Sequence, residues 1–156
     1  MSIHSQQKTR GKGDKYMLNL ITGPKGSGKT QQLIDLANQL VKSSHGNVIL
    51  IKKSQRNTST ADFNIRVTAM DDFKAIETLE EFIGFLYGMI AGNHDIETIC
   101  IDGVLKQANI NLDNLPDFLY KINKISLKHK IEFYLTISAP KEDLPDLGDI
   151  EYKIVW

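Results

Sequence analysis

The chain has 156 residues, of which 41% are hydrophobic and 24% charged, and its 19 lysine and arginine residues balance 19 aspartate and glutamate residues. These values are typical of one folded domain with a buried core, and they exclude a wholly disordered or fibrous chain. The single cysteine, Cys100, excludes a disulfide scaffold, while the lack of a secretory signal or of an apolar run near ~20 residues predicts a cytoplasmic protein without a membrane partner.

Charge is distributed unevenly along this chain. Residues 1–60 hold ten lysines and arginines against two acidic residues, whereas residues 61–156 hold nine against seventeen. Residues 1–15 contain almost no apolar side chain and are predicted to form a flexible basic arm before one domain over residues 16–156. The arm could attract phosphates, but no aromatic residue lies among its basic side chains to stack on bases, so the sequence does not favour a nucleic-acid partner.

The first part of the domain predicts strands separated by a helix and a polar loop. The helix begins at Gly28 and carries its apolar side chains in one stripe, and the loop covers residues 52–61. The middle one of the three strands is continuously apolar, as expected where both faces of a parallel sheet are covered, and the third alternates as an edge strand does. These strands are predicted over residues 16–22, 48–51 and 63–68.

A second helix is predicted after Thr78, because Thr78 and Glu81 have the spacing of a capping box. Glycines recur at every fourth position of this helix, at Gly84, Gly88 and Gly92. We expect the first two to allow close packing on the sheet and Gly92 to end the helix.

The rest of the chain continues the alternation. Asp113 or Asn114 is predicted to cap a third helix, with Pro116 tolerated in its first turn. Further strands are predicted over residues 98–101, 131–138 and 152–156. Alternating strands and helices predict an α/β fold, a three-layer sandwich with a mainly parallel sheet.

The strongest local signal is the string GPKGSGKT at residues 23–30, which matches G-x-x-x-x-G-K-[ST] at every required position. A predicted strand enters this string and a predicted helix leaves it. Glycines at such a turn let backbone N–H groups point inward as an anion cradle, and the helix N-terminus adds positive dipole. The string therefore predicts a phosphate-binding loop.

On this motif the chain resembles the P-loop NTPases over residues 16–156. The resemblance implies that ATP and Mg²⁺ bind, that Lys29 reaches the β- and γ-phosphates, and that Thr30 places its hydroxyl on the magnesium. It implies a phosphate cradle from the loop, with Lys25 either a further contact or a solvated side chain. The implied nucleotide-binding residues are Gly23, Lys25, Gly26, Ser27, Gly28, Lys29 and Thr30.

Asp102 is the second predicted anchor, because it follows the mostly apolar strand 98–101, as the magnesium-binding Walker B aspartate of that family does. Lys29 and Asp102 are accordingly the predicted catalytic residues. Two strand candidates precede Asp102, which resembles the RecA-like branch, where another strand separates the two Walker strands. In that branch the next strand often presents a polar residue to the γ-phosphate, and Thr136 and Ser138 are the candidates.

Related families fit less well. Asp102 is not followed by the glycine of a GTPase D-x-x-G switch, since position 105 is Leu105. The topology has a distant similarity to thymidine kinases, but Gly103 replaces the acid that follows their aspartate. Nucleotide kinases clamp phosphates with arginines, and this chain has only Arg10, Arg56 and Arg66. Overall the chain looks like small single-domain bacterial P-loop proteins that bind ATP and whose cellular roles are not established.

The sequence therefore predicts a Mg²⁺-dependent ATP-binding protein that hydrolyses ATP slowly or only with a partner. A small-molecule kinase and a non-catalytic nucleotide-binding module remain alternatives. Asp71 and Asp72 are candidate substitutes for the missing catalytic acid, with capping of the next helix as the alternative. Arg56 is a candidate arginine finger, for this site or for that of a neighbouring subunit. The partners left open are a nucleoside triphosphate, another protein and a second copy of the chain.

Overall fold

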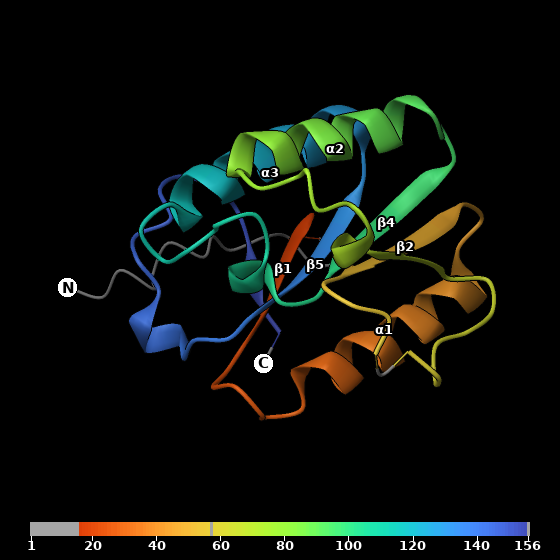
Figure 1. The fold of residues 1–156 in the computed structure, drawn as a ribbon, viewed down its shortest axis with the longest axis horizontal. Coiled ribbons are helices and arrows are strands. Elements are labelled where there is room, and N and C mark those ends of the chain that lie inside the picture. The colour runs from red at the N-terminus through yellow and green to blue at the C-terminus, as the bar shows by residue number, and fades with distance from the viewer. Residues whose placement is uncertain (1–15, 57, 156) are drawn as a thin grey trace.

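The computed structural model describes residues 16–56 and 58–155, which form a three-layer α/β sandwich around one six-stranded sheet (Figure 1). Every strand pair is parallel, and the strand order is β3-β2-β4-β5-β1-β6. The strands are β1 (Leu18–Thr22), β2 (Asn47–Lys52), β3 (Arg66–Ala69), β4 (Ile96–Ile101), β5 (Glu132–Ile137) and β6 (Lys153–Ile154). The helices are α1 (Lys29–Ser43), α2 (Leu79–Ala91) and α3 (Leu115–His129), and short 3₁₀ helices cover Met70–Asp72, Val104–Lys106 and Lys141–Asp143.

The predicted α/β class is confirmed, and the two faces of the sheet carry separate apolar cores. Helix α1 covers one face, while α2 and α3 lie together on the other (Figure 1). Beneath α1, Leu33 and Ala37 pack with Leu50 and Cys100. The larger core joins α2 and α3 to the opposite face, with Phe82 and Phe118 in edge-to-face contact. Burial raises the pKa of the Cys100 thiol, so this cysteine is an inert core residue.

The edge strand is shorter than its alternation predicts. Phe63, expected to begin it, is 98% exposed, whereas β3 starts only at Arg66. The preceding residues form a turn, in which the Asp62 carboxylate accepts a hydrogen bond from the Asn64 N–H at 2.8 Å and the Asp62 carbonyl accepts one from the Ile65 N–H at 3.0 Å. Asp62 therefore offers the backbone a local alternative to strand pairing.

Helix α2 begins as predicted, because both hydrogen bonds of the capping box at Thr78 and Glu81 are present. Gly92 follows the last helical residue and donates its N–H to the Gly88 carbonyl. The expectation that Gly84 and Gly88 allow close packing on the sheet is wrong. A Cβ atom at either position would meet nothing within 4 Å, since both glycines face away from the core.

Smaller differences occur at other element ends. Asn114 occupies the N-cap position of α3, but its side chain accepts a hydrogen bond from the Asn111 N–H at 2.7 Å instead of capping the helix. Lys52, expected in a polar loop, is the last residue of β2. The predicted arm over residues 1–15 and Trp156 lie outside the described residues. Within residues 16–56 and 58–155, no helix has the length and apolar character needed to cross a membrane.

Candidate functional site

The topology brings the motif loop and Asp102 to one edge of the sheet. Strand β5 lies between β1 and β4, so one strand separates the two that deliver the predicted site residues. The loop of residues 23–30 follows β1, Asp102 follows β4, and Thr136 is the last residue but one of β5. In open parallel sheets, ligands bind outside the carboxyl ends of the strands. We call this side the carboxyl edge.

The loop of residues 23–30 is held by its own backbone. The Ser27 N–H and hydroxyl both donate to the Pro24 carbonyl, at 3.3 and 2.7 Å, and the Gly23 N–H donates to the Ala139 carbonyl beyond β5 at 3.0 Å. Gly28 precedes α1 with a φ of 89°, a left-handed conformation that favours glycine. The first turn of α1 has no acidic residue of its own, so its N-terminal N–H groups and positive dipole end face the carboxyl edge, beside Asp102.

Lys29 is 6% exposed, and the hydrogen bonds of its ammonium go to neutral groups. Its Nζ donates to the Pro24 carbonyl at 2.7 Å and to the Ser27 hydroxyl at 3.4 Å. Desolvation lowers the pKa of Lys29, and repulsion from Lys106 adds to this effect, while attraction to Asp102 opposes it. Because burying a cation among neutral partners is costly, an anion bound here would be favoured.

Asp102 is fixed by three side chains. Thr30 Oγ1 lies 3.1 and 3.0 Å from the two carboxylate oxygens, and Thr136 Oγ1 donates to one of them at 2.9 Å. Gln107 Nε2 donates to the Asp102 backbone carbonyl at 3.2 Å. The Gly103 N–H donates to the Thr136 hydroxyl at 2.7 Å, which orients that hydroxyl toward Asp102. Thr136 thus positions Asp102 in this structure.

Gly103 turns the chain directly after Asp102. Its φ is 73°, and a Cβ atom there would lie 3.2 Å from Lys106 Cδ. A side chain at this position would therefore be strained, which accounts for the absence of an acid after Asp102.

A cavity of about 110 Å³ lies between the loop and the ends of β4 and β5. The structure brings five of the predicted nucleotide-binding residues and Asp102 to its wall, while Gly23 and Ser27 shape the loop from outside this wall. The predicted residues that line it are Lys25, Gly26, Gly28, Lys29, Thr30 and Asp102, together with the polar candidates Thr136 and Ser138, and Gly103 and Lys106 complete it.

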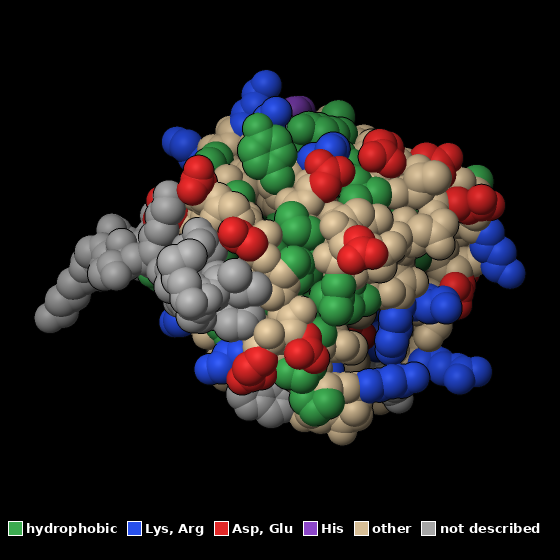
Figure 2. All heavy atoms as spheres, turned by 90° about the vertical axis from the view of Figure 1, so that its left-hand side faces the viewer, with side chains coloured by type: hydrophobic (Ala, Val, Ile, Leu, Met, Phe, Trp, Pro, Cys, Tyr) green, Lys and Arg blue, Asp and Glu red, His purple; other side chains and the backbone are tan. Residues whose placement is uncertain are grey.

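A second cavity of about 190 Å³ shares Thr30, Asp102 and Lys106 with the first. Its remaining wall comes from the end of β2 and the loop after it, namely Lys52, Lys53, Ser54 and Arg56. On the face that Figure 2 presents, lysine and arginine side chains gather toward the lower right, whereas acidic side chains dominate the upper right. Among the described residues lining either cavity, Asp102 is the only acid.

The sequence interpretation missed Lys52, Lys106 and Gln107. A usable signal existed for Lys52, since it ends an apolar strand and the carboxyl ends of parallel strands share one edge. Asp71 and Asp72, the predicted substitute acids, line neither cavity. They lie exposed in the 3₁₀ helix after β3, where the Asp71 N–H donates to the Lys53 carbonyl at 2.8 Å.

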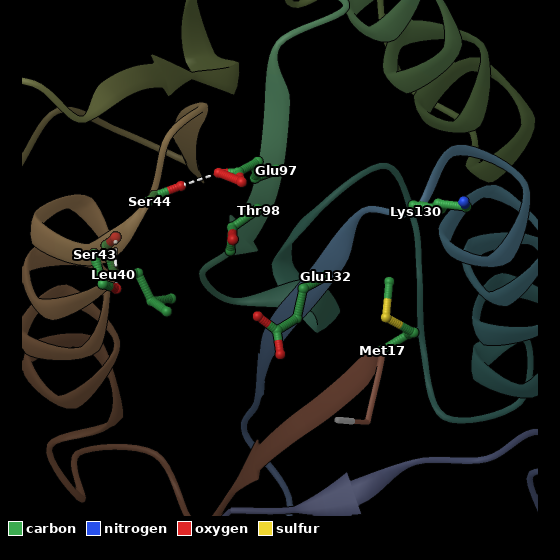
Figure 3. A pocket seen from close by; sticks show the side chains of 8 residues that line it. All are labelled: Met17, Leu40, Ser43, Ser44, Glu97, Thr98, Lys130 and Glu132. Atoms are coloured by element: carbon green, nitrogen blue, oxygen red, sulfur yellow. Dashed lines mark hydrogen bonds between the residues drawn. The ribbon is translucent and has the colours of Figure 1, made fainter. Parts of the chain in front are cut away.

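The opposite edge of the sheet also contains a hollow, of about 240 Å³, which Figure 3 shows from close by. There Glu97 points toward Ser44, whose hydroxyl donates to it, and the Gly46 N–H donates to the same carboxylate at 2.7 Å (Figure 3). These hydrogen bonds hold the pKa of Glu97 below its usual range. Glu97 therefore stabilises the turn between α1 and β2.

Comparison with known proteins adds no assignment: no family model matches the chain, and no curated protein matches it. Across the described residues, no group of three or more histidine, cysteine, aspartate or glutamate side chains is arranged to hold a metal ion. A metal at the carboxyl edge would therefore take most of its ligands from a bound phosphate compound and from water.

Proposed function

We propose that this protein adopts the P-loop NTPase fold of the RecA-like branch and binds ATP with Mg²⁺ at the carboxyl edge. The observation that carries the proposal is the placement of Lys29 and the Thr30–Asp102 pair on one cavity wall at the N-terminus of α1. The strand order, with β5 between β1 and β4, supports the branch.

The phosphates of ATP suit the environment of Lys29. In the free protein its ammonium is buried against the Pro24 carbonyl and the Ser27 hydroxyl. Phosphate oxygens would replace these neutral partners with charge-assisted hydrogen bonds, which are about twice as strong. The free N–H groups at the start of α1 would contact the same phosphates.

The oxygen atoms of Thr30 and Asp102 suit magnesium, which prefers hard oxygen ligands and keeps several waters. Bound between these side chains and the phosphates, the metal would neutralise negative charge on the nucleotide. Thr136 would keep Asp102 in place through its hydrogen bond.

Hydrolysis should be slow in the isolated chain. A water molecule needs a group that orients it, and among the described residues lining both cavities Asp102 is the only carboxylate. Asp102 is already hydrogen-bonded to Thr30 and Thr136. We therefore propose a slow or partner-activated ATPase, with turnover well below the ~10 s⁻¹ median of enzymes.

A nucleotide panel with and without Mg²⁺, read by calorimetry and followed by product analysis, tests this function. ATP with Mg²⁺ should bind best and yield ADP and phosphate slowly. Lys128→Met, on the exposed surface of α3, is the matched control for lysine substitutions at the site. Equal binding of ATP by the parent chain and Lys29→Met would refute the site, and turnover at ordinary enzyme rates would refute the slow ATPase.

A further inference from the structure

The second cavity at the carboxyl edge has a charge that the proposed ATP site does not use. Lys52, Lys53 and Arg56 line this cavity and not the first one, and Lys106 lines both. The facing acid is Asp102 alone among the described residues, and Thr30 and Thr136 already bond to it. Four cations thus surround a space whose only carboxylate is engaged elsewhere.

Lys52 forms the buried floor of this cavity. The residue is 5% exposed, and its Nζ donates to the Arg56 carbonyl at 2.6 Å. Pairing of Ile51 with Ile101 places Lys52 beside Asp102 on the neighbouring strand. Desolvation lowers the pKa of Lys52, repulsion from Lys106 lowers it further, and Asp102 counteracts both. As at Lys29, the buried ammonium donates to a neutral carbonyl, so a further anion would be favoured.

The rim of the cavity is exposed, whereas its floor at Lys52 is buried. Lys53 and Arg56 are exposed, and Ser54 beside them offers a hydroxyl. A volume of about 190 Å³ is below the roughly 300–1,000 Å³ of whole ligand pockets, so the cavity fits one charged group of a larger ligand. A group that reaches the buried lysine while contacting the rim needs several acceptor oxygens and a high charge, as a terminal phosphate has.

We propose that the second cavity is a subsite for the terminal phosphate of a small phosphorylated compound, which lies beside the terminal phosphate of ATP. Lys52 contacts that phosphate from below, and Arg56 and Lys53 contact it from the rim. Thr30, Asp102 and Lys106 separate the two phosphate positions, because they line both cavities. A nucleic-acid backbone is disfavoured, since its phosphodiesters have substituents on both sides and would contact only the exposed rim. The position beside ATP rests on the proposed function, whereas the subsite itself does not.

Titration with inorganic phosphate tests the subsite. The parent chain, saturated with Mg²⁺ and a nonhydrolysable ATP analogue, should bind phosphate saturably at one additional site. Removing one charged hydrogen-bond donor, in Lys52→Met or in Arg56→Gln, should weaken this binding about tenfold to a hundredfold. Lys128→Met should bind phosphate as the parent does. Arg56 is exposed, so Arg56→Gln keeps the test valid if Lys52→Met fails to fold.

Two further arms separate the outcomes. Lys29→Met without nucleotide should still bind phosphate, so the subsite is tested even if ATP fails to bind and the proposed function is refuted. The proposal is overturned if phosphate binding is absent, or if it is lost in Lys29→Met and kept in both Lys52→Met and Arg56→Gln. Binding of a deoxythymidine oligonucleotide without terminal phosphates, in the absence of phosphate binding, would instead indicate a nucleic-acid surface.

Discussion

The carboxyl and amino edges of the sheet differ in what their charged side chains contact. At the amino edge, Glu97 accepts hydrogen bonds from Ser44 and Gly46, and these bonds lower its pKa because they stabilise the charged form. At the carboxyl edge, Lys29 and Lys52 are buried against neutral groups, and their pKa values are lowered because the charged form is disfavoured.

The same direction of pKa shift therefore has opposite meanings for stability. The Glu97 carboxylate is satisfied by its own chain and contributes to the fold. Desolvation of the two charged lysines outweighs their attraction to Asp102, so their charged forms reduce the stability of the fold. Such an arrangement is typical of groups that bind a ligand. Substitutions at the two edges should accordingly separate stability from binding.

The largest effect is expected from Lys29→Met. Replacing the buried ammonium with an apolar side chain of similar length should weaken ATP binding at least a hundredfold and leave the ligand-free protein equally or more stable. In the parent, ATP at a hundred times its dissociation constant adds about 2.7 kcal/mol, which is a melting shift of about 5–10 °C. Thermal melting with and without ATP measures both quantities, and an unchanged shift in Lys29→Met would refute the assignment of this lysine.

Asp102→Asn should have the next largest effect, on metal dependence. The asparagine carbonyl can still accept from Thr30 and Thr136, so the fold should lose about 1 kcal/mol or less. The lost negative charge should remove most of the gain in ATP affinity that Mg²⁺ provides. Calorimetry with and without Mg²⁺ distinguishes this result from a structural role, in which Asp102→Asn would unfold the chain and keep the metal dependence.

These expectations also show how much of the site follows from sequence. The loop of residues 23–30 and Asp102 could be predicted because each depends on local patterns, a glycine-rich turn after a strand and an acid at a strand end. Their meeting at one edge followed from the parallel sheet. The two apolar cores followed in the same way from strands that are continuously apolar.

Lys106 was not predicted, because its role depends on long-range placement, and Lys52 was missed although it ends an apolar strand at the same edge as Asp102. Lys52 joins the site only because β2 pairs with β4, and Lys106 only because the chain turns at Gly103 with a positive φ. The orientation of Gly84 was likewise unpredictable from spacing. A glycine every fourth residue defines one helix face without saying whether it is inside or outside.

A smaller effect is expected from pH at the carboxyl edge. ATP binding favours the charged form of Lys29, so it should raise the lowered pKa of this lysine and take up protons where the lysine is partly neutral. As pH rises through the lowered pKa of Lys29 toward the ordinary 10.5, ATP affinity should fall, by up to about tenfold per pH unit. Calorimetry over a pH series from about 7.5 to about 10.5, in buffers of different ionisation enthalpy, measures the uptake. Equal affinity and no uptake across the whole series, up to the ordinary lysine value, would show that Lys29 does not face the ligand.

The smallest effect is expected from Glu97→Gln at the amino edge, and it should appear in stability alone. Glu97 is exposed, so losing its charge-assisted hydrogen bonds to Ser44 and Gly46 should cost only about 0.5–1 kcal/mol. The folded-state pKa of Glu97 is depressed, so its contribution is fully present above the ordinary value of 4.5 and is lost as pH falls through the lowered value. Denaturant unfolding at neutral pH should therefore distinguish Glu97→Gln from the parent, and this difference should shrink under acid conditions. ATP binding should not change, because Glu97 lies at the edge opposite the loop of residues 23–30. A loss of ATP affinity in Glu97→Gln without a loss of stability would show that the two edges do not have separate roles.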